Sequence, residues 1–89
     1  MRLKIKLTIQ QILDFWAAVP ADDDAKRHHV VMSLNETAKD IVEILNNGET
    51  TEDEIVSKLL QEYDVTEEEL RPHVQSVIQN LRDEHLLVE

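Results

Sequence analysis

The sequence contains no cysteine, one glycine and two prolines among its 89 residues, and only 3% of the residues are aromatic. The absence of cysteine excludes disulfides, thiolate metal sites and a cysteine nucleophile. No stretch approaches the roughly 20 apolar residues of a membrane span. The N-terminal stretch MRLKIKLTIQQILDF lacks the apolar core and cleavage site of a signal peptide. We therefore expect a soluble, cytoplasmic chain.

Basic residues are scarce in the second part of the chain. Residues 1–34 carry five basic and four acidic side chains, whereas residues 35–89 carry four and fifteen. A nucleic-acid binder neutralises phosphates with lysine and arginine, and this chain, with a net charge of −10, would mostly repel them. Acidity by itself gives solubility rather than a function.

Apolar residues make up 42% of the chain, which is typical of a globular protein. A chain of this length has room for one modest core. We find no internal repeat, linker or low-complexity run. Residues 1–89 are therefore expected to form a single domain.

In the first third of the chain the apolar residues recur with a period close to two, which indicates short strands. Thr8 to Leu13 and Trp16 to Val19 are predicted to form a hairpin, with Asp14 and Phe15 at its turn. Pro20 is expected to end the second strand, because proline cannot donate to a ladder.

A third strand is predicted over His28 to Ser33, after a charged loop from Ala21 to Lys26. Val30 and Val31 lie at its centre and favour extended backbone. A sheet of only three strands leaves an edge open, and such an edge promotes aggregation unless it is covered or used.

Three helices are predicted after the strands. Asn35 is a plausible N-cap for the first helix, which runs to about Asn46 and ends before Asn47-Gly48. Thr51 and Thr66, each followed three residues later by a glutamate, open the other two as capping boxes. Pro72 is expected to bend the third helix or delay its start. The expected buried positions are Ala38, Ile41, Ile44, Leu45, Ile55, Val56, Leu59, Leu60, Tyr63, Leu70, Val74, Val77, Ile78 and Leu81.

Three strands followed by three helices indicate an α+β domain of the winged helix-turn-helix type, with Leu86 to Val88 closing against the core. Such a fold also allows a DNA-binding regulator as an alternative function. The charge opposes that alternative, because the third helix opens with Glu67, Glu68 and Glu69 instead of basic residues.

Residues 8–88 resemble the coenzyme PQQ synthesis protein D family. The resemblance is carried by Leu34-Asn35-Glu36-Thr37 ahead of the first helix, by Gly48 with a threonine after it, and by the apolar pattern from Val74 to Leu81. Further marks are Ile41, Leu45, Glu54-Ile55, Leu59, Tyr63 and Leu86-Leu87.

The resemblance implies a peptide-recognition domain without catalytic activity. Domains of this family serve as chaperones or recognition elements for ribosomally synthesised, post-translationally modified peptides. The leader of the precursor peptide adds as a strand to the third strand and lies against the third helix. The partner enzyme is often a radical SAM protein. A homodimer through the same open edge is a further expectation.

Two candidate surfaces follow from this hypothesis. An edge strand offers unpaired backbone groups to a guest peptide. The candidate edge consists of Arg27, His28, His29, Val30, Val31, Met32 and Ser33.

The candidate wall on the third helix combines Val74 of its apolar face with the flank formed by Arg71, Gln75, Ile78 and Arg82. Two interpretations of this flank remain open. Ile78 and the arginines could seat an acidic, apolar leader. Alternatively, Ile78 is simply the edge of the core and the arginines are solvated.

Other chemistry finds little support. His28 and His29 point to opposite sides of a strand, and no cysteine completes a tetrahedral metal site. Asp22-Asp23-Asp24 lacks the spacing of a calcium loop. Ser33-Leu34 is a weak match to the modified serine of acyl carrier proteins. No catalytic triad or phosphate loop is evident, so we expect no enzyme activity, no cofactor and no metal.

Overall fold

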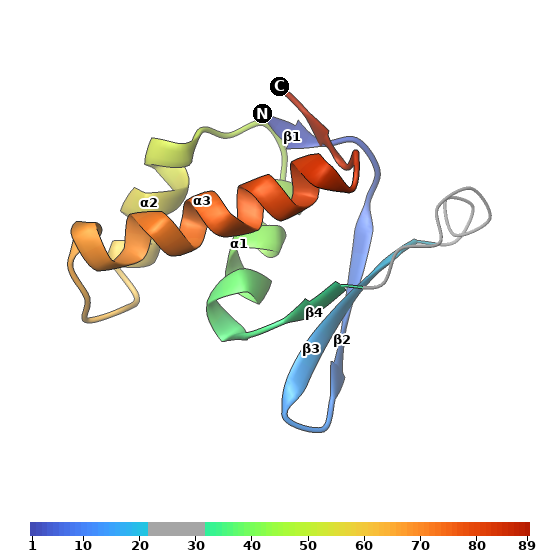
Figure 1. Cartoon of the computed structure of the whole chain (residues 1–89), viewed down its shortest axis with the longest axis horizontal. Coiled ribbons are helices and arrows are strands. Elements are labelled where there is room, and N and C mark those ends of the chain that lie inside the picture. Colours follow the sequence, from blue (N-terminus) through green and yellow to red (C-terminus); the bar gives the residue numbers. More distant parts are fainter. Residues whose placement is uncertain (22–31) are drawn as a thin grey trace.

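In the computed structural model, three helices pack together and a long hairpin projects away from them (Figure 1). The structure describes residues 1–21 and 32–89. The described strands are β1 (Arg2–Leu3), β2 (Leu7–Ile12), β3 (Phe15–Pro20), β4 (Met32–Leu34) and β5 (Leu87–Val88). The helices are α1 (Glu36–Asn46), α2 (Glu52–Leu60) and α3 (Glu67–Asp83).

The three-stranded antiparallel sheet expected from the sequence is confirmed, with the strand order β2-β3-β4. Strand β3 is central because it pairs with β2 from Leu7↔Pro20 to Ile12↔Phe15. Strand β4 pairs with the other side of β3 over three residues, and so forms an edge among the described strands.

The hairpin turn lies one residue earlier than the sequence suggested. Phe15 belongs to β3, and the turn is made by Leu13 and Asp14. Leu13 takes a φ of 54°, in the left-handed region, which is unfavourable for residues with a Cβ. Its side chain is 86% exposed. The turn therefore holds a leucine where local backbone energy favours asparagine or glycine.

Replacing Leu13 by asparagine should raise the free energy of unfolding by about 0.5–1 kcal/mol, because asparagine tolerates the left-handed conformation. Urea denaturation monitored by circular dichroism measures the change. Asp14→Asn is the matched control, since Asp14 has a negative φ, and should shift stability far less. A variant at Leu13 that is no more stable than wild type would contradict the strain.

The helix boundaries follow the predicted caps. The Asn35 side chain accepts a hydrogen bond from the Ala38 N–H at 2.8 Å, and the Thr51 hydroxyl accepts from Glu54 at 3.1 Å. Thr66 caps α3 in the same way. The helix begins at Glu67, so the delayed start expected from Pro72 is wrong. The Thr66 cap stabilises the first turn of α3, and the backbone hydrogen bond that Pro72 cannot donate does not outweigh this stabilisation.

Helix α2 ends at Leu60, so Tyr63 follows the helix and is not part of its buried face. The half-buried Tyr63 still packs against the core. The core contains most of the expected apolar positions of the three helices, but Ile44, Leu60 and Val77 are only partly buried. It also contains Val42, which was not expected, Leu34 of β4 and the fully buried Leu86. It lies between the helices and the inner face of the sheet.

Strands β1 and β5 form a second, two-stranded sheet that the sequence pattern did not reveal. Arg2 lies opposite Val88, and Leu3 lies opposite Leu87. The two ends of the chain thus lie side by side at the C-terminal end of α3 (Figure 1). This pairing explains how Leu86 and Leu87 close against the core.

Candidate functional site

Among the described residues, no backbone partner contacts the outward groups of Ser33 on the outer edge of β4. Residues along a strand of an antiparallel sheet direct their backbone groups alternately to either side. The Ala21 N–H donates to the Lys6 oxygen at 3.1 Å, in register with the β2–β3 ladder. Because backbone groups alternate along β3, those of Ala17 also point towards β2. Ser33 lies opposite Ala17. Its N–H and C=O therefore point away from β3, while its two neighbours in β4 bond to β3.

A groove of about 260 Å³ runs from this edge to α3. Strand β4 and the start of α1 form one wall, and α3 forms the other. None of the eight lining residues is an aspartate, glutamate, lysine or arginine. They are Ser33, Asn35, Thr37, Ala38, His73, Ser76, Val77 and Asn80.

The groove continues into a second hollow of about 170 Å³, which shares Thr37 and His73 with the first. This hollow is more apolar. Leu70 is buried beneath it, and Val65 is 41% exposed at its rim. Glu69 is the charged residue of its lining. The two hollows adjoin each other along α3, from Glu69 to Asn80.

The groove lies beside a different face of α3 from the flank expected from the sequence. The groove is lined by His73, Ser76, Val77 and Asn80, which follow one another at helical spacing. These residues include no Asp, Glu, Lys or Arg, in a helix that opens with three glutamates. That uncharged stripe was visible in the sequence and is the signal that could have found the wall.

Arg71 and Gln75 face α2 instead of the groove. The Arg71 guanidinium lies 2.6 Å from Glu52 and 3.0 Å from Asp53, and also pairs with Glu67. These carboxylates, Glu52 first, raise the pKa of Arg71. Gln75 donates to Glu52. The chain's own carboxylates occupy Arg71, and the seat for an acidic leader on this flank stays a prediction.

The remaining residues of the predicted wall also make contacts within the chain instead of lining the groove. Val74 is fully buried and Ile78 is 4% exposed, so both belong to the core. The interpretation of Ile78 as a core residue is confirmed. Arg82 pairs with Glu89 at 2.5 Å, near the end of the chain. None of these three side chains lines the groove.

Of the predicted edge, Met32 and Ser33 are described, with Met32 half-buried against the core and Ser33 exposed. Arg27, His28, His29, Val30 and Val31 lie outside the described residues, as does Asp22-Asp23-Asp24. Ser33 lies inside a strand, not at the start of a helix as in carrier proteins.

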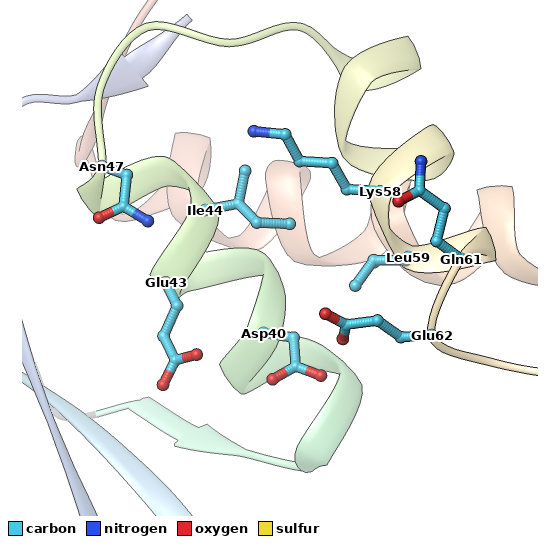
Figure 2. A pocket seen from close by; sticks show the side chains of 8 residues that line it. All are labelled: Asp40, Glu43, Ile44, Asn47, Lys58, Leu59, Gln61 and Glu62. Atoms are coloured by element: carbon cyan, nitrogen blue, oxygen red, sulfur yellow. The ribbon is translucent and has the colours of Figure 1, made fainter.

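A separate hollow of about 240 Å³ lies between α1 and α2 (Figure 2). The carboxylates of Asp40 and Glu62 point into it, and the Lys58 side chain extends along its other end. Asp40 accepts a hydrogen bond from the Tyr63 hydroxyl and pairs with Lys39 at 3.0 Å. The hydrogen bond between Tyr63 and Asp40 thus joins α1 to the turn after α2.

Burial, and then the hydrogen bond to Asp40, raise the pKa of Tyr63 to about 12. Tyr63 is the single tyrosine of the chain, so its phenolate absorbance can be followed directly. Recorded just after a pH jump, before unfolding, the absorbance should titrate near pH 12. Asp40→Asn should lower the midpoint towards 10, the ordinary value.

Because the folded-state pKa of Tyr63 is raised, its contribution to stability is fully present below pH 10 and is lost as the pH rises towards 12. An ordinary midpoint near 10 in the folded wild-type domain would contradict the buried hydrogen bond.

Comparison with known proteins now adds to the geometry. The family model of coenzyme PQQ synthesis protein D matches residues 23–87, which is most of the chain. The chain belongs to the PqqD family. A solved structure of TbiB1 in complex with the TbiA(beta) leader peptide has the same fold, with a TM-score of 0.72 and 18% sequence identity. The match covers 98% of this PqqD-family chain and 94% of the other. No curated protein matches.

Residues 1–21 and 32–89 contain no cluster of three histidine, aspartate or glutamate side chains placed to hold a metal ion. Within the same residues, no helix has the length and apolar character needed to cross a bilayer. The groove beside β4 is therefore the main candidate.

Proposed function

We propose that this domain binds the leader of a ribosomally made precursor peptide and presents it to a modifying enzyme. The leader lies in the groove between β4 and α3 as an added strand. The observation that carries the proposal is the backbone of Ser33, whose N–H and C=O point out of the sheet into the groove. Membership of the PqqD family and the leader peptide bound to TbiB1 support it.

Strand addition uses backbone hydrogen bonds for affinity and side-chain pockets for selectivity. The Ser33 edge supplies the backbone hydrogen bonds, and the uncharged wall of α3 supplies the side-chain contacts that give selectivity. Hydroxyl, amide and imidazole groups at Ser76, Asn80 and His73 can bond to polar groups of the guest. At the described lining of this groove, selectivity then depends on shape and hydrogen bonding.

An apolar side chain of the leader fits the second hollow. Val65 is 41% exposed there, and Tyr63 and Leu70 also line it. Val65 would gain burial when the peptide binds, which favours association by roughly 25 cal/mol for each Å² of apolar surface removed from water. The hollow therefore gives the leader one preferred anchor position.

The function of the domain is delivery. A bound leader holds the rest of the precursor close to the enzyme, which raises its effective concentration without any chemistry by the domain. A radical SAM enzyme is the partner class that we propose. A short precursor gene and a radical SAM gene beside the gene for this domain would supply the peptide and the enzyme for testing.

Two variants of α3 with the same change of charge test the groove. Val77→Lys places a cation in the wall, whereas Gln75→Lys places it on the flank that faces α2. Fluorescence anisotropy with the labelled leader of the neighbouring precursor should show at least about tenfold weaker binding for Val77→Lys. Gln75→Lys should bind within about twofold of wild type. The reverse order of the two variants would contradict the placement of the leader.

A further inference from the structure

A second backbone edge lies at the N-terminal segment, far from the groove. Arg2, Lys4 and Lys6 are exposed, and they alternate with the partly buried Leu3 and Ile5. Strand β1 ends at Leu3 and the chain bends at Lys4 and Ile5, so the three cations gather around this bend of the segment. The overall charge of the chain is −10, so a cluster of this sign stands apart from the rest of the surface.

These three cations have no ion-pair partner among the described residues. Within residues 1–21 and 32–89, the side-chain cations that form ion pairs are Lys39, Arg71 and Arg82. Lys58 on α2 is likewise unpaired within these ranges. Glu49 follows Gly48 and accepts a hydrogen bond from the N-terminal amine at 2.8 Å. The positive charge at the segment is therefore available to a partner.

The backbone of the segment is also open on its outer side. The Lys4 N–H donates to the Leu86 oxygen at 2.7 Å, so the backbone groups of Arg2 and Lys4 point towards β5. Leu3 lies between them and directs its backbone groups away from β5. On that outer side, Thr50 bonds to Met1, and the amide of Asn46 bonds to both backbone groups of Leu7. Between these two anchors, no described residue bonds to the outer groups of Leu3.

A cleft of about 250 Å³ runs along this open stretch. Gly48 lies on its far side, and a Cβ built there would meet no atom within 4 Å. The cleft is therefore uncrowded at Gly48. Its lining consists of Arg2, Leu3, Lys4, Ile5, Lys6, Leu45, Asn46 and Gly48.

We propose that this N-terminal cleft binds an acidic polypeptide segment, which also reaches the outer backbone groups of Leu3. Arg2, Lys4 and Lys6 all line the cleft, so carboxylates of the guest can pair with them. Charge complementarity selects this occupant over a nucleic acid. Three cations on a chain of net charge −10 neutralise too few phosphates to hold DNA or RNA. The edge belongs to a different sheet from β4, so both edges can be occupied together.

Fluorescence anisotropy with an acetylated, amidated decapeptide of alternating glutamate and valine tests the proposal. Wild-type domain should bind this peptide, with an affinity that falls as salt is raised. It should not bind the same peptide with lysine in place of glutamate. Lys4→Glu should weaken binding at least about tenfold. Lys58→Glu is the matched control, since it reverses an unpaired cation elsewhere, and should change binding by less than about twofold.

Other results would overturn the assignment. They include no binding to wild type, equal losses in the two variants, or tighter binding of a DNA duplex than of the peptide. Ser33→Pro should leave binding of the glutamate-valine peptide unchanged. Weaker binding to this variant would mean that the peptide binds in the β4 groove instead. Circular dichroism of every variant confirms that the domain is folded. Because leader binding is measured with another peptide, failure of either proposal leaves the other intact.

Discussion

Replacing Ile78 by alanine should lower the free energy of unfolding by about 2–4 kcal/mol, the usual cost of emptying a buried aliphatic site. Ile78 is 4% exposed and packs among the core residues of α3. The cost is a large fraction of the stability of a domain of this size. Urea denaturation measures it. Val77→Ala, one residue earlier and only partly buried, is the matched control and should cost clearly less.

The same pair of variants separates the core from the groove. Where both remain folded, Ile78→Ala should bind the leader nearly as well as wild type, because its side chain does not line the groove. Val77→Ala should bind more weakly. A stable Ile78→Ala variant that no longer binds the leader would place Ile78 in the groove and Val77 outside it.

Replacing Ser33 by proline should weaken leader binding at least about tenfold. Proline lacks an N–H, and the Ser33 N–H is the donor that points out of the sheet. The lost hydrogen bond contributes about 0.5–1.5 kcal/mol, and the proline ring obstructs the approach of a paired strand. Isothermal titration calorimetry with the leader peptide measures the change.

The design of this variant rests on the alternation in β4. Ser33 gives no backbone bond to β3, so proline removes a donor only on the outer side and is tolerated on an edge strand. Ser33→Ala keeps the N–H and should bind like wild type. Equal losses in the two variants would assign the effect to the hydroxyl and remove strand addition from the account.

The helices could be predicted from the sequence because their signals are local. Asn35, Thr51 and Thr66 each cap a helix within three residues of their own position. The apolar periodicity between the caps then identifies the buried faces. The strand edge at Met32 and Ser33 was found for a similar reason, since Leu34 and the cap at Asn35 limit where β4 ends.

The contacts between elements could not be read in this way. Periodicity gives the faces of α3 but does not say which neighbour each face meets. Arg71 meets Glu52, which is 19 residues earlier, and only the folded chain brings them together. The pairing of β1 with β5 joins the two ends of the chain through strands of two residues each, too short to show a period.

The hairpin turn was misplaced by one residue for an energetic reason. Turn signals depend on residues that accept a positive φ, and Leu13 is not one of them. Register with β3 overrides this local preference, because the ladder from Leu7 to Ile12 fixes where the chain must reverse.

Hydrogen–deuterium exchange at the Ser33 amide, followed by NMR, tests the central claim most directly. In the free domain this amide faces solvent and should exchange fast, while the amides of Met32 and Leu34 bond to β3 and are protected. Saturating leader peptide should slow exchange at Ser33 by at least about tenfold and change its two neighbours far less. A Ser33 amide that exchanges equally fast with the leader bound would contradict strand addition at β4.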